Sequence, residues 1–269
     1  MIIVGELINA SRKPVKTAIE SRDQAAIQQL ALDQAEAGAD YIDANAGVFP
    51  TEEIEYLQWV VDSVSAVTEV PVCLDSPNPK ALEAVLAGVG ATSGQVPMLN
   101  SISLESERWH TLLPQVAGTD LKIVALCMSD AGMPETADQR VAIADKLING
   151  LVQSNVKIDN IYVDPLVQSL GTNAAYGKEF LVAVERIMRE FEGVHTICGM
   201  SNISFGLPER AFLNQTFMTM AIACGLDGAI VNPLNQRMMA NIIAAESLAG
   251  RDAFCMNYLK AYRAGQFRF

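Results

Sequence analysis

The sequence predicts an α/β protein, a single (β/α)8 TIM barrel that spans residues 1–269, and three observations lead to this prediction. Strand-like and helix-like segments alternate along the whole chain, which is typical of a parallel sheet. About eight such units fit into a chain of this length, as in a closed barrel. Several apolar runs end in Asp or Asn at a turn, as expected where parallel strands deliver polar groups to one end of a barrel.

The expected strands are short runs of apolar and β-branched residues bounded by turn-forming residues. In chain order they cover residues 2–5, 40–44, 70–74, 96–100, 122–128, 161–164, 196–200 and 228–231. No Gly-x-Gly-x-x-Gly follows the first strand, and no Gly-x-x-x-x-Gly-Lys-Ser/Thr occurs in the sequence. The sequence therefore does not indicate the phosphate-binding loops of dinucleotide-binding or P-loop folds.

The expected helices alternate with these strands and carry apolar residues at helical spacing. They cover residues 23–37, 51–67, 79–88, 104–116, 136–154, 178–191, 207–224 and 236–248. In the first helix, Ile27 and Ala31 share one face and Gly38 marks the end. Thr51 is expected to cap the second helix in a capping-box pattern, and Ser103 is expected to cap the fourth.

The strand ends supply the candidate functional residues. Because the carboxyl ends of the strands meet at one mouth of a barrel, polar residues there are expected to surround a single pocket. These residues are Glu6, Asn9, Asp43, Asn45, Asp75, Asn100, Asp130, Asp164, Ser201, Asn202 and Asn232. Carboxylates accept hydrogen bonds from ring N–H and amine donors, whereas amides both donate and accept. The set therefore predicts a site for a neutral or hydrogen-bond-donating heterocycle rather than for a phosphate.

A structural role is the alternative for each of these residues. An Asp or Asn after a strand is often a turn former or the N-cap of the next helix. Asp75 stands before Ser-Pro-Asn-Pro and Asp164 before Pro165, so a turn explains either residue as well as a site does. His195 precedes a strand, at the end of the barrel opposite the mouth, and is expected to be structural.

The composition excludes several classes of function. A net charge of -12 argues against general affinity for nucleic acid or for anionic membranes. No apolar run reaches the roughly 18 residues of a membrane span, and the N-terminus shows no secretory signal. Five cysteines without a Cys-x-x-Cys pair indicate a reducing cytoplasm and no disulfide framework. Because the chain has only two histidines, we expect no metal site.

Six short motifs follow one another along the chain. They are GELIN at residues 5–9, DAN at 43–45, CLDS at 73–76, LNS at 99–101, YVDPL at 162–166 and GMSNIS at 199–204. This ordered set covers nearly the whole chain and resembles the pterin-binding methyltransferases. The similarity is greatest to the methyltetrahydrofolate:corrinoid protein methyltransferases of anaerobes and to the folate module of cobalamin-dependent methionine synthase.

The resemblance implies a barrel that holds a pterin in its mouth. The enzymes of this family transfer a methyl group between N5 of tetrahydrofolate and the cobalt of a corrinoid. The residues that the resemblance assigns to substrate binding are Asp75, Asn100, Asp164, Asn202, Asp43, Asn45, Ser201 and Arg210. Asn202 and Asp164 are the expected catalytic residues, because the side-chain oxygen of Asn202 would stabilise positive charge on N5 in a network with Asp164.

The resemblance also implies the substrates and partners. The substrate is expected to be tetrahydrofolate or 5-methyltetrahydrofolate. Cobalamin or another corrinoid is expected on a separate corrinoid protein, because the chain lacks the Asp-x-His-x-x-Gly motif of a corrinoid module. A homodimer is implied by the family. Related sequences often carry Gln three residues after the asparagine of the Ser-Asn pair, and Phe205 in that place points to a different partner or direction of transfer.

Two rival functions stay open. Dihydropteroate synthases share the pterin barrel, but they typically carry Ser-x-Arg-x-His near the last strand, and residues 228–234 contain no such motif. A non-catalytic subunit that binds pterin or docks a corrinoid protein is the second rival. A subunit of that kind could retain every mouth residue, so only turnover would distinguish it from an enzyme.

Overall fold

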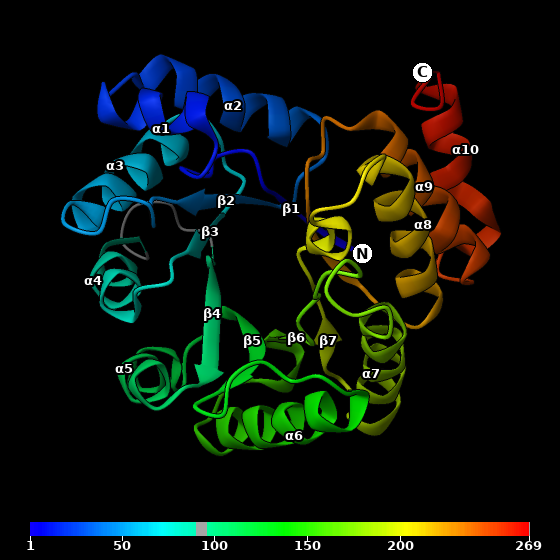
Figure 1. The fold of residues 1–269 in the computed structure, drawn as a ribbon. Helices are drawn as coiled ribbons and strands as arrows, with labels where there is room; N and C mark the ends of the chain where they lie inside the picture. Colours follow the sequence, from blue (N-terminus) through cyan, green and yellow to red (C-terminus); the bar gives the residue numbers. More distant parts are fainter. Residues whose placement is uncertain (90–95, 269) are drawn as a thin grey trace.

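The computed structural model describes residues 1–89 and 96–268, and within them parallel strands form a barrel surrounded by helices (Figure 1). The strands are β1 (Ile2–Gly5), β2 (Tyr41–Asn45), β3 (Val72–Asp75), β4 (Met98–Leu104), β5 (Lys122–Ser129), β6 (Ile161–Asp164), β7 (His195–Thr196) and β8 (Gly228–Val231). The sheet order runs from β7 down to β1 and ends with β8. A parallel bridge between Gly199 and Ile230 joins its two ends. The predicted (β/α)8 barrel is confirmed.

The helices lie outside the barrel, most of them between consecutive strands in the chain (Figure 1). They are α1 (Lys13–Glu20), α2 (Gln24–Glu36), α3 (Glu53–Ser65), α4 (Pro79–Val89), α5 (Ser106–Val116), α6 (Ala137–Gln153), α7 (Tyr176–Glu190), α8 (Arg210–Ala223), α9 (Gln236–Leu248) and α10 (Met256–Arg263). Helices α1 and α10 were not predicted. Among the described residues, no helix is long and apolar enough to cross a membrane.

The seventh and fourth strands differ from their predicted bounds. The seventh strand was expected at residues 196–200, but β7 covers only His195–Thr196 because the chain turns into a short 3-10 helix, η2 (Met200–Ser204). The fourth strand continues to Leu104, so the helix expected at residues 104–116 begins only at Ser106. The predicted part of this strand at residues 96–97 precedes β4, whose pairing starts at Met98.

Both predicted helix caps were wrong. Helix α3 has Glu52 as its N-cap, and the hydroxyl of Thr51 donates a hydrogen bond to the Glu52 carboxylate. Helix α5 has Glu105 as its N-cap, and the hydroxyl of Ser103 likewise donates to the side chain of Glu105. In both cases the predicted residue lies before the actual N-cap, so its hydroxyl is not placed to accept from the first free N–H groups of the helix. Thr136, at the start of α6, does form a complete capping box.

Alternate residues of the strands face the inside and the outside of the barrel. The inward residues form one buried apolar cluster below the mouth: Val4, Tyr41, Cys73, Met98, Val124, Tyr162 and Ile197. The outward residues, such as Ile42 and Leu74, belong to a larger core between the strands and the helices. The barrel is therefore a packed core, and only the residues beyond this apolar cluster are available for a site at the mouth.

Two arginines on the helices fix the loops that follow the strands. The guanidinium group of Arg108, on α5, donates to the backbone oxygens of Ser76, Pro77 and Ser101 at 2.7, 2.8 and 2.6 Å. On α6, Arg140 donates to the backbone oxygen of Pro165 at 2.8 Å. Because Arg108 satisfies carbonyl groups of two loops and Arg140 those of the loop after β6, the two arginines hold the strand ends in place around the mouth.

Candidate functional site

A polar pocket of about 350 Å³ opens at the carboxyl ends of the strands. Its lining residues come from five strand ends and from the loop after β1. They are Glu6, Asn9, Ser11, Arg12, Asp43, Asp75, Asn100, Gly199, Ser201, Asn202 and Ile230. Most of them belong to the set predicted at the mouth, so the structure brings residues far apart in the sequence into one site.

The strand register sets the depth of the polar residues. In the pairing of β2 with β3, Asp43 is level with Cys73. Two residues further along, Asn45 is level with Asp75, and Asp75 is level with Asn100 on β4. Because side chains two residues apart point to the same face, both rows face the inside of the barrel. Asp43 therefore lies deeper than Asp75 and forms part of the pocket floor.

Asp75 is held in place by its neighbours. The Asn45 Nδ2 group donates to Asp75 Oδ2 at 2.7 Å. Burial raises the pKa of the Asp75 carboxyl group, while the Asn45 hydrogen bond and the charge of Arg108 act in the opposite direction. Asn45 was predicted to line the mouth, but it is not among the lining residues of the pocket. Its hydrogen bond instead orients Asp75, which does line the pocket.

Glu6 and Asp43 are the other two carboxyl groups of the pocket. Glu6 forms an ion pair with Arg12 at 2.8 Å, and burial raises its pKa against the opposing effect of that arginine. Asp43 is only 2% exposed, and its Oδ1 atom has no hydrogen-bond partner. Burial, and then the neighbouring carboxyl groups of Asp75 and Glu6, raise the pKa of Asp43 well above its ordinary value.

The turn after β7 carries Ser201 and Asn202 into the pocket. Arg210, at the start of α8, donates to the Ser201 backbone oxygen at 2.7 Å and to the Ser204 hydroxyl at 2.9 Å. This clasp fixes the short helix η2. Arg210 was expected to bind substrate, and in the ligand-free structure two of its donors hold the loop. The amide side chains of Asn202 and Asn100 make no hydrogen bond within the described part of the chain.

Asp164 lies at the end of β6, is almost fully buried and is not among the residues that line the pocket. Its Oδ1 atom accepts a hydrogen bond from the backbone nitrogen of Leu166 at 2.8 Å. Burial raises the pKa of Asp164 to about 7, even though this hydrogen bond and the charge of Arg140 lower it. A carboxyl group with this pKa changes its protonation state near neutral pH.

Two residues predicted at the mouth have local structural roles. Asp130 is exposed and accepts hydrogen bonds from the backbone nitrogen and the hydroxyl group of Ser106. Asn232 accepts a hydrogen bond from the backbone nitrogen of Leu234 at 2.9 Å. For these two residues the structural explanation that the sequence allowed is the one observed, and neither lines the pocket.

Sequence reasoning missed Ser11 and Arg12, which line the pocket from the loop between β1 and α1. The omission follows from the missed helix α1, which made this loop look like part of a long connection. A signal was present, because α1 has Pro14 in its first turn, the place where proline favours the start of a helix. Gly199 and Ile230 were also missed, because an apolar or glycine residue carries no polar signal.

At the opposite end of the barrel, His195 lies between two carboxylates. Its Nδ1 atom is 2.6 Å from Asp227 Oδ2, and its Nε2 atom is 3.1 Å from Asp159 Oδ1. Its ring stacks on Tyr162 with the ring centroids 4.7 Å apart. The hydrogen bond to Asp227 is the largest of the effects that raise the pKa of His195. The expected structural position of this histidine, away from the mouth, is confirmed.

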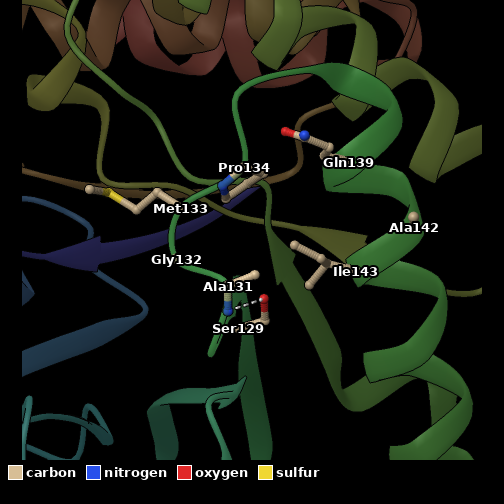
Figure 2. Close-up of a pocket in the computed structure, with 8 residues that line it drawn as sticks. All are labelled: Ser129, Ala131, Gly132, Met133, Pro134, Gln139, Ala142 and Ile143. Atoms are coloured by element: carbon tan, nitrogen blue, oxygen red, sulfur yellow. Dashed lines mark hydrogen bonds between the residues drawn. The ribbon is translucent and has the colours of Figure 1, made fainter.

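A second, smaller hollow of about 260 Å³ lies beside the loop after β5 (Figure 2). It is lined by Ser129, Ala131, Gly132, Met133, Pro134, Gln139, Ala142 and Ile143. None of these side chains is charged, and the hydroxyl of Ser129 accepts a hydrogen bond from the backbone nitrogen of Ala131 (Figure 2). The polar pocket at the mouth, with its carboxylates and free amides, is therefore the candidate active site.

The pocket suits a ligand rich in N–H donors that also carries acceptor atoms. Carboxylates accept from such donors, and the free amides of Asn100 and Asn202 offer both a donor and an acceptor. The pocket contains no nucleophile beside a general base. Within residues 1–89 and 96–268, no group of three or more His, Cys, Asp or Glu side chains has the arrangement of a metal site.

Comparisons with known proteins agree with this chemistry. The family model described as "pterin binding enzyme" matches residues 5–232. The methylcorrinoid:tetrahydrofolate methyltransferase of Eubacterium limosum is 38% identical over 268 residues, which cover 99% of this chain and 97% of that protein. The methionine synthase of Mycobacterium tuberculosis is 27% identical over 245 residues, and the match covers 86% of this chain but only 20% of that longer protein.

Among solved structures, the dihydropteroate synthase of Xanthomonas albilineans in complex with 7,8-dihydropteroate has a similar fold. Its TM-score is 0.70 at 19% sequence identity, and the match covers 92% of this chain and 93% of that one. At this level of identity the similarity concerns the fold alone.

Proposed function

The chain belongs to the pterin-binding enzyme family, and from this we propose that it is a methyltransferase acting between tetrahydrofolate and a corrinoid. The methyl group moves between N5 of the folate and the cobalt of a corrinoid carried by a separate protein. The observation that carries the proposal is the nearly full-length similarity to a methylcorrinoid:tetrahydrofolate methyltransferase. The pocket supports it, since its carboxylates and amides suit the donor and acceptor edge of a pterin ring.

Within this proposal, Asp75 and Asn100 hold the pterin ring from neighbouring strands. Asp75, supported by Asn45 and Arg108, accepts hydrogen bonds from ring N–H and amine donors. The free amide of Asn100 pairs with an adjacent donor and acceptor of the ring. Asp164 contributes a further acceptor when it is ionised, and its pKa of about 7 makes this contribution dependent on pH.

Asn202 is the residue that we place at N5. When the methyl group moves to the folate, a bond from N5 to the methyl carbon forms as the cobalt–carbon bond breaks, and N5 releases its proton. The two electrons of the broken bond stay on the cobalt. Positive charge therefore passes through N5 in either direction, and the side-chain oxygen of Asn202 stabilises it. Arg210 supports this role by fixing the turn on which Asn202 stands.

The corrinoid supplies the cobalt that gives or takes the methyl group, and a partner protein has to bring it to the mouth. Phe205 is 70% exposed and follows directly after the turn that carries Asn202. An exposed aromatic ring next to this turn in the chain suits contact with that partner. We propose that the methyl group comes from the demethylation of a methylated compound and that the host organism is an anaerobe.

We further propose that the chain is one domain and works as a homodimer in the cytoplasm. Support for a second copy comes from the apolar side chains around α10, since Leu248 is 85% exposed, Phe254 94% and Tyr262 66%. Support for the cytoplasm comes from the five cysteines, all of which are free thiols. Sedimentation of the purified protein tests the dimer.

Two other functions remain as rivals. A dihydropteroate synthase-like reaction is suggested by the shared fold alone, and such an enzyme would form a pterin–aminobenzoate bond without any corrinoid. A non-catalytic subunit would bind folate but turn nothing over. Assays of pteroate formation and of methyl transfer separate the three functions.

The test of the proposed function is a spectral assay in both directions. Methylcob(III)alamin is mixed with tetrahydrofolate, and cob(I)alamin with 5-methyltetrahydrofolate, and the change in the cobalamin spectrum is followed. Conversion in either direction, lost in Asp75→Ala and Asn202→Ala, is the expected result. If folate binds but neither reaction runs, with free cobalamin or with a corrinoid protein, the chain is a binding subunit.

A further inference from the structure

The buried carboxyl groups around the mouth differ in one respect, the presence of a positive charge close by. Three of them have an arginine: Arg12 serves Glu6, Arg108 serves Asp75 and Arg140 serves Asp164. Asp43 is the exception. In the described part of the chain, no arginine, lysine or histidine forms an ion pair with it.

The groups that face Asp43 are acidic or neutral. From the loop after β1, the carboxyl group of Glu6 acts on it, and from β3 the carboxyl group of Asp75 does so. Cys73, also on β3, is level with Asp43 in the strand register, and its neutral thiol acts weakly in the opposite direction by lowering the pKa of Asp43, while burial raises the pKa of the thiol itself. The positive charges of Arg12 and Arg108 are engaged with Glu6 and with the loop carbonyl groups beside Asp75.

An ionised carboxylate in this position would be costly. Moving an unpaired charge out of water has a large penalty, so a buried acid without a partner usually takes up a proton instead. Of two neighbouring carboxyl groups, the one that lacks a counter-charge holds the proton. Here that group is Asp43, because Asp75 has the Asn45 amide and Arg108 to favour its ionised form.

The oxygen of Asp43 that lacks a partner indicates a role for this proton. Asp43 Oδ1 is buried, has no hydrogen-bond partner and belongs to a side chain that lines the pocket. A protonated carboxyl group is a hydrogen-bond donor, whereas an ionised one only accepts. The floor of the pocket therefore offers a donor among groups that otherwise accept.

We propose that Asp43 stands in the ligand-free enzyme as a carboxylic acid and donates its proton in a hydrogen bond to an acceptor atom of the pterin ring. The acceptor is the ring carbonyl oxygen or a ring nitrogen with a lone pair. This inference rests on the proposed function. It assigns Asp43 to substrate recognition, since the ionised Asp75 takes the donors of the ring and the acid takes an acceptor.

The proposal predicts how folate affinity changes with pH. As the pH rises through the pKa of Asp43, the donor is lost and a further negative charge faces the acceptor atom of the ring. Affinity then falls. Asp164 acts with the opposite sign, because it becomes a hydrogen-bond acceptor when it ionises. Affinity for folate should therefore rise with pH as Asp164 ionises, which is the acid limb of the profile, and fall as Asp43 ionises, which is the alkaline limb.

The experiment measures the dissociation constant of 5-methyltetrahydrofolate by calorimetric titration from about pH 6 to about pH 10, which spans the pKa values of raised acids and thiols. Wild-type protein should bind roughly tenfold more weakly at the alkaline end, the loss of about one hydrogen bond. Asp43→Asn keeps a donor that cannot ionise, and its alkaline limb should disappear. Asp43→Ala should bind roughly tenfold more weakly at low pH as well.

A matched control addresses the neighbouring thiol. Cys73→Ala removes the other titratable group at the pocket floor and should keep the alkaline limb. A second readout does not depend on folate. The infrared carbonyl band of protonated carboxyl groups should be weaker in ligand-free Asp43→Asn than in the wild type, and both are compared in an Asp164→Asn background, because Asp164 with its pKa of about 7 contributes to the same band.

Two results would overturn the proposal. One is an alkaline limb in Asp43→Asn that equals that of the wild type, and the other is an infrared band that Asp43→Asn leaves undiminished in the Asp164→Asn background. Failure of the proposed function looks different. In that case neither the wild-type protein nor any variant binds folate at any pH, so there is no pterin to accept a hydrogen bond from Asp43. The infrared band still decides whether Asp43 carries a proton.

Discussion

The two ends of the barrel differ in how their polar side chains are hydrogen-bonded. At the amino ends of the strands, His195 is bonded on both ring nitrogens, by Asp227 and Asp159, and the N-terminal amine pairs with Glu246 at 3.1 Å. At the carboxyl ends, Asp43 keeps a buried oxygen without a partner and Asn202 keeps its amide free. Both ends also have a buried polar atom without a partner, but Asp43 at the carboxyl ends lines the pocket, whereas Thr196, whose Oγ1 atom is unpaired at the amino ends, does not.

This difference separates stability from function. A buried polar group without a partner costs free energy, so it persists where a ligand supplies the partner. Substitutions at the mouth should therefore change binding and catalysis with little effect on folding, and substitutions at the base should do the reverse. The predictions below test this division, in order of decreasing effect.

The largest effect is expected for Asn202→Ala. The substitution removes the oxygen that stabilises charge at N5, and loss of one such group typically lowers kcat by about 10²-fold or more. The melting temperature should stay close to that of the wild type, because the side chain makes no hydrogen bond within the described residues. Stopped-flow methyl transfer and thermal unfolding measure the two quantities.

Asn149→Ala is the matched control for this substitution. Asn149 is an exposed asparagine on α6, hydrogen-bonded only to Asp145, and its loss should leave transfer unchanged. A normal kcat in Asn202→Ala would show that Asn202 has no role in the reaction. A large fall in its melting temperature would show that a mouth residue also stabilises the fold, against the division between the two ends of the barrel.

The next effect concerns Asp164. Its pKa of about 7 means that it gains the charge needed to accept strong hydrogen bonds only as the pH rises past neutrality. Folate affinity of the wild type should therefore increase from pH 6 to pH 8, and this acid limb should be absent in Asp164→Asn. Hydrogen bonds to charged groups contribute about 1.5–3 kcal/mol, so the variant should bind roughly tenfold or more weakly at pH 8.

An Asp164→Asn profile that retains the acid limb would show that another group titrates there. Glu6 is the nearest candidate, since burial also raises its pKa. The same titration of Glu6→Gln resolves the two cases.

The sequence predicted the barrel well and its polar mouth in large part, for a physical reason. Strand periodicity and the Asp or Asn at each strand end are local features, and the closed barrel brings them together at one mouth. What a side chain does after a strand depends on neighbours that are distant in the chain. Asn45 serves Asp75 across two strands, and Arg210 clasps the turn that carries Ser201. No local pattern carries this information.

The errors in the sequence reading have the same origin. Thr51 looks like a helix cap, but α3 begins one residue later, with Glu52 as its N-cap. Asp130 looks like a site residue, but Ser106, the first residue of α5, donates to both of its carboxylate oxygens. In each case the position at which a helix begins decides the role of the residue. Likewise, the missing counter-charge of Asp43 becomes visible only when the arginines are placed.

At the base of the barrel, Asp227→Ala tests the stabilising role of the polar groups. Asp227 accepts from His195 and from the backbone nitrogen of Thr196 at 2.8 Å. Without it, the buried amide of Thr196 loses its partner, and unfolding should become easier by about 2 kcal/mol. Asp159→Ala is the control, because that carboxylate is exposed and should contribute little. Neither substitution should alter kcat below the unfolding transition, and a change in kcat would link the base to the chemistry.

The smallest effect is the pH dependence of stability that His195 contributes. Its two carboxylate partners raise its pKa above 6.5, so the folded state binds the proton more tightly than the unfolded chain does. The resulting stabilisation is fully present below the unfolded pKa of about 6.5 and is lost as the pH rises through the folded pKa. The melting temperature of His195→Gln should therefore fall furthest below that of the wild type in acid, and the two should converge towards alkaline pH. A difference that grows with pH would mean that His195 stabilises the fold in its neutral form, through its stacking on Tyr162, and that charge pairing at the base matters less than packing.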